Sequence, residues 1–474
     1  MTILPLDPRE NETPEALFRF LSECQAVAVR KRHAQLVSIS LEVESLDPLA
    51  VLESIFEAGE QHFYVEQPAN GLAVAGAEAV LSFSANGPGR FAACQQFVDE
   101  ALANALAVGD LASPFSGPHF FHAFSFFNDV GGTEPFSAAT VFVPRWQVAT
   151  REGRTTAVAN LSIDAASPLE LLAERIWRAR KKFARFEYSA PGFRPASKPA
   201  AISVADVLAP GAYEASVAAA VRRIAAGEFQ KIVLARARDL TADDAFHPLQ
   251  VLNGLRQRYA DCYSFSFANG KGQSLIGASP ERLVEVRSGT ISTEALAGSA
   301  RRGASASEDA ALGSGLLRSE KDLAEHAYVV QAIRRRLAPL GIDPTIPPRP
   351  VLKRLANVQH LQTPFRAALP ASVRLLDVLA ELHPTPAVGG SPREQALNGI
   401  RELETFPRGL YAGSVGWLDS RGEGEFFVAL RSALVDGAQA RIYAGAGIVD
   451  GSQPEQELAE TELKFRALQD ALTA

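Results

Sequence analysis

Apolar and polar residues alternate along several segments of the chain, which is the pattern of strands with one buried face. The first such segment is 37–44, where every second residue is apolar. Three further segments combine alternation with a turn signal: 140–163 (turn at Glu152-Gly153), 263–297 (turn at Ser288-Gly289) and 426–449 (turn at Asp436-Gly437). These turns predict hairpins, and hairpins join antiparallel strands.

Other segments repeat their apolar residues at the three- and four-residue spacing of amphipathic helices. The predicted helices are 167–187 behind a Ser167 cap, 213–224 ending before Gly227, 319–337 behind a Ser319 cap, and 455–472. Hairpins outnumber strand–helix–strand crossovers, which favours an α+β fold with largely antiparallel sheets.

Two segments lack either pattern. Residues 189–201 are rich in Pro, Ala and Ser and are predicted to be a linker. Residues 301–315 are rich in Gly, Ala and Ser and are predicted to be a mobile loop.

The composition is that of an ordinary globular protein, with 47% hydrophobic and 21% charged residues among 474. The formal net charge of −7 argues against nucleic acid as the main partner. The three cysteines are too few and too widely spaced for a disulfide framework or a CxxC metal site. No basic leader and no apolar stretch of about 18 residues is present, so we expect a cytoplasmic protein without a membrane span.

Lys231 occupies an unusual place in the expected strand 229–237. Alternation puts it on the same face as Phe229, Val233, Ala235 and Ala237. Its ammonium group could reach water along an apolar surface, or it could protect a sheet edge. If it is buried, desolvation lowers the pKa of the lysine and makes it a usable general base.

Three glutamates at helix or strand starts also have two interpretations each. Glu281 follows a Ser-Pro pair and is either a solvated turn carboxylate beside Arg282 or a recessed acid with a raised pKa. Glu325 lies off the apolar stripe of its helix, and Glu460 forms an ordinary i,i+4 pair with Lys464. Carboxylates from two helices, with an anionic ligand between them, would equally suit Mg²⁺.

The segment 443–451, YAGAGIVDG, could form a glycine-rich cradle for an anion. It is not a dinucleotide fingerprint, because Asp450 stands at the third glycine position and no helix follows directly.

Ten short motifs follow one another along the chain: QKIVLARA, IGASPERL, EALAGSARRG, SEKDLAEHAYVVQAI, VQHLQTPF, LHPTPAVGG, YAGSVGW, VALRSA, YAGAGIV and ELAETELKF. Their order resembles the chorismate-utilising enzymes, closely over 205–474 and more loosely before it. The resemblance implies large antiparallel sheets packed together, helices outside and a central active site. It implies an amino-terminal half, 1–200, and a chorismate-binding catalytic region, 201–474, within one structural unit.

The resemblance also implies roles for individual residues. Lys231 matches the general base that activates water for attack at C2 of chorismate, and Glu281 matches the acid that protonates the departing C4 hydroxyl. Glu325 and Glu460 match the Mg²⁺ ligands, with Glu457 binding directly or through water. The residues that match the substrate pocket are Gly298, His360, Ala387, Tyr411, Arg431, Gly445, Gly447 and Lys464.

A few positions distinguish the branches of the family. Aminodeoxychorismate synthases have a lysine at the position of Ala297, and anthranilate synthases have a glutamine-like residue at the position of Lys231. The segment His383–Ala387 resembles isochorismate synthases, which form isochorismate for menaquinone or siderophore biosynthesis. The alternatives are a salicylate synthase and a non-catalytic chorismate-binding protein. We expect a monomer that uses Mg²⁺, with chorismate as its small-molecule substrate and no amidotransferase subunit.

Overall fold

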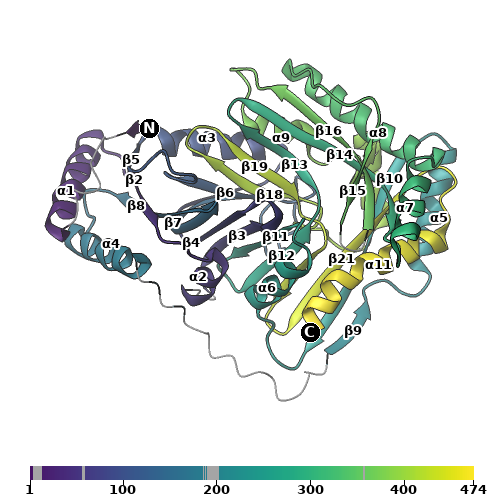
Figure 1. Cartoon of the computed structure of the whole chain (residues 1–474), viewed down its shortest axis with the longest axis horizontal. Helices are drawn as coiled ribbons and strands as arrows, with labels where there is room; N and C mark the ends of the chain where they lie inside the picture. The colour runs from purple at the N-terminus through teal and green to yellow at the C-terminus, as the bar shows by residue number, and fades with distance from the viewer. Residues whose placement is uncertain are drawn as a thin grey trace.

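In a computed structural model, the strands form one continuous sheet (Figure 1). This sheet divides into two arms at a long strand, β7 (Ala139–Arg151). The structure describes residues 1–3, 13–55, 59–184, 186, 188, 202–355 and 358–473. The predicted linker, 189–201, lies outside these residues. No helix among them is long and apolar enough to cross a membrane.

Strand β7 creates the division because it has different partners along its length. One edge pairs with β4 (Leu72–Ala85) throughout, while the other pairs with β6 (His119–Phe124) at its start and with β8 (Arg154–Ile163) at its end. Beyond β8 lies a stem of β2 (Gln35–Val43), β5 (Ala105–Gly109) and β1 (Thr2–Ile3). The pairs of β5 with β1 and β2 are parallel, and the other strand pairs of the described chain are antiparallel.

The two arms contain the remaining strands. Continuing from β4, the first arm consists of β3 (Gln61–Gln67), β11 (Tyr263–Asn269), β12 (Gln273–Ser279), β20 (Ser432–Asp436), β21 (Gln439–Ile448), β10 (Lys231–Ala242), β9 (Ile202–Asp206) and β17 (Gly390–Ser391). Continuing from β6, the second arm consists of β18 (Ser414–Asp419), β19 (Gly424–Val428), β13 (Arg282–Arg287), β14 (Thr290–Arg301), β16 (Val358–Ala368) and β15 (Val351–Arg354). Both arms mix strands from before and after residue 200, because β3 pairs with β11 and β6 pairs with β18.

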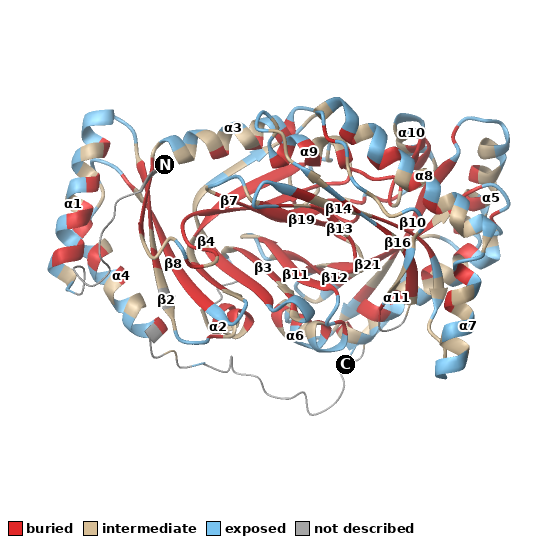
Figure 2. Ribbon diagram, turned by 45° about the horizontal axis from the view of Figure 1, so that its top comes forward, coloured by how far each residue is buried: buried red, intermediate tan, exposed pale blue. Residues whose placement is uncertain are grey.

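The arms pack against each other through aromatic side chains. Phe63 of the first arm stacks on Phe121 of the second with ring centroids 4.3 Å apart, and Tyr263 stacks on Phe427 at 5.0 Å. All four side chains are buried, and Figure 2 shows both arms as mostly buried strands beneath partly exposed helices. Such large apolar surfaces supply much of the free energy of folding.

The helices cover the outer faces of the arms and the stem (Figure 2). Those on the first arm are α2 (Pro48–Ile55), α5 (Ala212–Ala225), α6 (Pro248–Arg258), α10 (Arg393–Leu403) and α11 (Pro454–Thr473). Those on the second arm are α3 (Arg90–Ala103), which also contacts β4, α7 (Ala306–Leu316), α8 (Glu320–Leu337) and α9 (Leu375–Leu382). The stem carries α1 (Pro14–Lys31) and α4 (Leu169–Ala184), and two short 3₁₀ turns complete the fold, η1 (Pro68–Asn70) and η2 (Ala338–Leu340). The predicted α+β class with packed antiparallel sheets and outer helices is confirmed.

The predicted mobile loop at 301–315 is wrong, because most of it forms helix α7. Ser305 caps this helix by accepting a hydrogen bond from the Glu308 amide, and acids fill the first turn. Arg302 pairs with Asp309 at 2.7 Å, and Leu316 is buried. Local capping and packing therefore outweigh the flexible composition of the segment.

The predicted cap of α4 also differs in detail. The helix is present, but the Ser167 hydroxyl donates to Asp164 Oδ1 and accepts from the Asp164 amide. The serine closes the preceding turn instead of capping the helix.

A buried ion pair fastens β10 to the segment that follows α9. The Arg408 guanidinium, 1% exposed, binds both carboxylate oxygens of Glu404 at 2.6 and 2.9 Å. It also donates to the carbonyls of Val233 and Val388 at 2.8 and 3.0 Å. One side chain thus joins three separate stretches of chain.

We expect Arg408→Met to destabilise the protein by about 3–5 kcal/mol, because the mutation leaves the Glu404 carboxylate buried without its counter-ion. Chemical denaturation of the variant and of wild type measures the difference. Arg318→Met, at an exposed arginine, is the matched control and should change stability little. Equal stability of the Arg408 variant would contradict the assigned role of the pair.

Candidate active site

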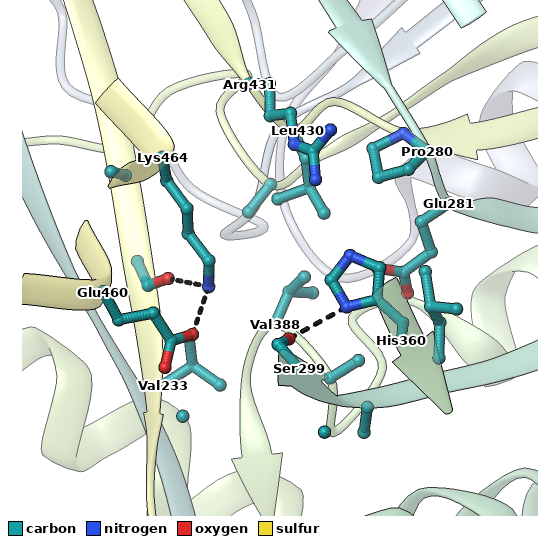
Figure 3. Close-up of a pocket in the computed structure, with 18 of the residues that line it drawn as sticks. Val233, Pro280, Glu281, Ser299, His360, Val388, Leu430, Arg431, Glu460 and Lys464 are labelled. Atoms are coloured by element: carbon teal, nitrogen blue, oxygen red, sulfur yellow. Dashed lines mark hydrogen bonds and ion pairs between the residues drawn. The ribbon is translucent and has the colours of Figure 1, made fainter. Parts of the chain in front are cut away.

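A cavity of about 810 Å³, counted to its open mouth, lies between the arms (Figure 3). The strands that line it are at the end of the arms far from the stem (Figure 1). Strands β10 and β21 line it from the first arm, β14 and β16 line it from the second, and helices α8 and α11 complete the wall. Every site residue selected from the sequence lines this cavity except Glu457, which is buried nearby in α11. The lining residues among them are Lys231, Glu281, Gly298, Glu325, His360, Ala387, Tyr411, Arg431, Gly445, Gly447, Glu460 and Lys464.

Lys231 is the first residue of β10, and its side chain is 1% exposed. The ammonium group donates to Glu325 Oε1 of α8 at 2.7 Å. The strand pairs with β17 and β21 here, so the lysine guards no free edge. The alternative in which its ammonium group lies in water is therefore wrong.

Gly447 makes room for this pair of charges. A Cβ atom on Gly447 would lie 2.9 Å from Glu325 Oε1 and 3.1 Å from Lys231 Cε. A larger residue at this position would push the lysine and the glutamate apart. Gly445 and Gly447 thus allow close approach of neighbouring groups to strand β21, whereas Gly451 lies in the turn that follows it.

Glu281 lies immediately before β13 and is 4% exposed. Burial is the main cause that raises the pKa of its carboxyl to about 8, and the negative charge of Glu294 adds to it. Its neighbour Arg282 pairs instead with Glu425 at 2.9 Å. The solvated turn carboxylate is therefore wrong, and at neutral pH the carboxyl of Glu281 holds a proton that it can donate.

Two buried side-chain nitrogen atoms of residues that line the cavity have no partner within the described chain. Within the described chain, Arg431 Nη1 and His360 Nε2 have no hydrogen-bond partner (Figure 3). His360 Nδ1 lies 2.9 Å from Ser299 Oγ, and burial holds the pKa of the imidazole well below its ordinary value, so the ring is neutral. Buried polar groups normally find a partner, so these atoms are suited to a polar ligand.

Lys464 adds a second positive charge from α11. Its ammonium group donates to Glu460 Oε1 and to the Gly445 carbonyl, both at 2.7 Å. Tyr411 lies beside Gly445 and stacks on Tyr443 with ring centroids 4.8 Å apart. The cavity therefore has a rigid aromatic wall next to its cationic groups.

Three carboxylates stand between α8 and α11. Burial raises the pKa of Glu457, and the negative charges of Glu460 and Glu325 add to this effect. Glu325 pairs with Lys231 and Glu460 with Lys464. In this arrangement the described residues contain no group of three His, Cys, Asp or Glu side chains placed to hold a metal ion. The donors are nevertheless all carboxylate oxygens, the chemistry that Mg²⁺ prefers.

The residues that distinguish the family branches lie on two sides of the cavity. Strand β14 bulges at Gly298, whose φ is 77°, so that Ala297 pairs with Leu361 and Ser299 pairs with His360. Ala297 and Ala387 both line the cavity with small side chains. His383 instead points away, with Nε2 3.1 Å from the Ser125 carbonyl.

Sequence reasoning missed part of the wall. The unselected lining residues are Val233, Pro280, Leu296, Ser299, Val388, Ala412, Leu430, Tyr443 and Ala444. Most of them are one or two residues from a selected one, so their position beside a motif was the available signal.

The comparisons with known proteins agree over nearly the whole chain. Residues 19–473 match the model of the family described as chorismate binding enzyme. The chain is 40% identical to the salicylate biosynthesis isochorismate synthase of Pseudomonas aeruginosa, over 93% of this chain and 90% of that protein. It is 35% identical to the isochorismate synthase MenF of Bacillus subtilis, over 93% of this chain and 94% of that protein.

Solved structures have the same fold. The menaquinone-specific isochorismate synthase MenF of Escherichia coli superposes with a TM-score of 0.76 at 27% identity, over 95% of this chain and 99% of that one. Anthranilate synthase component I of Streptococcus pneumoniae superposes with a TM-score of 0.66 at 22% identity, over 84% of this chain and 92% of that one.

Proposed function

Because this chain belongs to the chorismate-binding enzymes, we propose that it is an isochorismate synthase that converts chorismate to isochorismate. One observation carries the proposal: a buried lysine and a buried glutamate, whose pKa is raised by burial, line the same cavity. Lys231 comes from β10 of the first arm, and Glu281 comes from the connection between β12 of the first arm and β13 of the second. An acid and a base on separate walls can act on two positions of one bound ring.

The chemistry assigned to the two residues conserves all atoms. Lys231 acts as the general base and takes a proton from water as the water oxygen bonds to C2 of chorismate. The C1=C2 double bond moves to C1=C6, the C5=C6 double bond moves to C4=C5, and the C4–O bond breaks as Glu281 donates its proton to the departing hydroxyl. One water enters and one leaves, so the net reaction is an isomerisation.

The remaining polar groups suit a substrate with two carboxylates. Arg431 and Lys464 supply positive charge, and neutral His360 supplies a hydrogen bond. A guanidinium binds a carboxylate bidentately, which orients the ring as well as holding it. The stacked Tyr411 and Tyr443 restrict the space beside it.

We assign Mg²⁺ to Glu325 and Glu460, with Glu457 bound directly or through water. The metal would neutralise a substrate carboxylate and orient it. Glu325 pairs with Lys231 and Glu460 pairs with Lys464, so both carboxylates already bind a cation at the cavity wall.

The relatives' names and the small residues at the branch positions favour this function over the alternatives. Both curated relatives above are named isochorismate synthases, and one name adds salicylate biosynthesis. Retention of Lys231, Glu281 and the three carboxylates supports an enzyme over a non-catalytic chorismate-binding protein. We expect a cytoplasmic monomer that needs no amidotransferase and serves menaquinone, siderophore or salicylate formation.

Incubation of the purified protein with chorismate and Mg²⁺ is expected to give isochorismate without stoichiometric pyruvate or salicylate. The enolpyruvyl ether is expected to stay intact because the segment His383–Ala387 resembles that of isochorismate synthases. Chromatography of the products, with pyruvate measured by lactate dehydrogenase and salicylate by fluorescence, follows the reaction.

The same mixture should form from either compound, because the reaction only moves a hydroxyl within an isomeric ring. Chorismate incubated without protein is the control. Stoichiometric pyruvate and salicylate would make the protein a salicylate synthase, and unchanged chorismate would leave a binding protein.

A further inference from the structure

The backbone on one side of Glu281 is held by a lysine that does not reach the cavity. Lys353 of β15 donates to the Pro280 carbonyl at 2.7 Å and to Glu294 Oε1 of β14 at 2.8 Å. Its side chain is 21% exposed, and it is absent from the cavity wall. Lys353 therefore acts on the residue before Glu281 without touching a substrate.

Glu294 holds the backbone on the other side. Its Oε1 also accepts from the Arg282 amide at 3.2 Å, and Oε2 accepts from the Gln362 side chain. The Glu294 side chain is 9% exposed, so its charge is poorly screened. The Lys353–Glu294 ion pair thus binds the Pro280 carbonyl before Glu281 and the Arg282 amide after it.

We propose that Lys353 and Glu294 are positioning residues for the general acid, fixing the backbone on both sides of Glu281 and balancing the charge around its carboxyl. The inference rests on the proposed function, in which Glu281 protonates the leaving hydroxyl. Neither residue was selected from the sequence.

The charged groups facing Glu281 come from three strands. They are Glu294 from β14, Lys353 from β15 and Lys231 from β10, and the Thr385 hydroxyl faces it from the segment after α9. Besides burial, Glu294 raises the pKa of Glu281, whereas Lys353 and Lys231 lower it. Because Glu281 must hold a proton to act, activity falls as the pH rises through this pKa of about 8.

Two substitutions should move this alkaline limb of the kcat/KM profile in opposite directions. Lys353→Met removes a positive charge, so the pKa of Glu281 rises and the limb moves to higher pH. Glu294→Gln removes a negative charge, so the limb moves to lower pH. Removal of one neighbouring charge should shift the pKa of Glu281, and with it the alkaline limb, by about one pH unit. Loss of positioning should also lower kcat roughly 10- to 100-fold with little change in KM.

Lys353→Arg keeps the charge and should leave the limb in place. Lys271→Met, at an exposed turn, is the matched control and should behave as wild type. If Lys353→Met does not fold, the kcat/KM profiles of Glu294→Gln and Lys353→Arg still test the inference. If the alkaline limb of the kcat/KM profile lies at the same pH in wild type and in Glu294→Gln, the inference is wrong. Isochorismate formation by wild type would still support the proposed function in that case. Absence of isochorismate in wild type would remove both.

Discussion

Lys231→Gln is expected to fold normally and to form isochorismate ~10²- to 10⁴-fold more slowly than wild type. Glutamine keeps a polar side chain of similar length that can still donate to Glu325, but it cannot take a proton from water. Steady-state kinetics with chorismate and Mg²⁺ measure the loss, and it should appear in kcat.

The control for this variant is Lys271→Gln, an exposed lysine in the turn between β11 and β12, which should retain full activity. Thermal melting should show that Lys231→Gln is folded. Near-normal isochorismate formation by the Lys231 variant would remove the lysine from the reaction.

Removal of divalent ions is expected to abolish turnover, and added Mg²⁺ should restore it. Without the metal, the carboxylates of Glu325 and Glu460 would place negative charge beside an anionic substrate, and Mg²⁺ would offset that charge. Dialysis against a chelator followed by Mg²⁺ titration, with turnover and calorimetric binding as separate readouts, tests this expectation.

Glu460→Ala should weaken the binding of both Mg²⁺ and chorismate. Glu455→Ala is the matched control, because Glu455 is an exposed carboxylate in the first turn of the same helix. Full activity in excess chelator, or unchanged Mg²⁺ affinity of the Glu460 variant, would contradict the metal assignment.

The sequence predicted elements best where turn chemistry and periodicity agreed. Glu152-Gly153 and Ser288-Gly289 both have positive φ angles in the structure, as a two-residue hairpin turn requires. The helix beginning after Ser319 follows its serine cap, whose hydroxyl accepts from the Asp322 amide. Composition misled at 301–315, because the short-range capping by Ser305 decides that segment.

The site could not be assembled from periodicity alone. All residues of β10 from Lys231 to Ala237 are buried, so alternation does not distinguish the cavity face from the opposite one. The motifs of the family located the residues, but their convergence depends on pairings such as β14 with β16 and β10 with β21. Lys353 lies outside the motifs, and Glu294 begins the motif EALAGSARRG without an assigned role, so both become visible only through their contacts with the backbone around Glu281.

The division of the sheet at β7 has a consequence for synthesis on the ribosome. Strands β3 and β6 are synthesised early, but one edge of each pairs with a strand that is made much later. Strand β3 pairs with β11 at residues 263–269, and β6 pairs with β18 at residues 414–419. Unpaired strand edges are templates for association with other chains. The nascent polypeptide therefore exposes two unpaired strand edges through much of translation. The edge of β6 stays unpaired until β18, one of the last strands, has been made. Chaperones protect large proteins during this period.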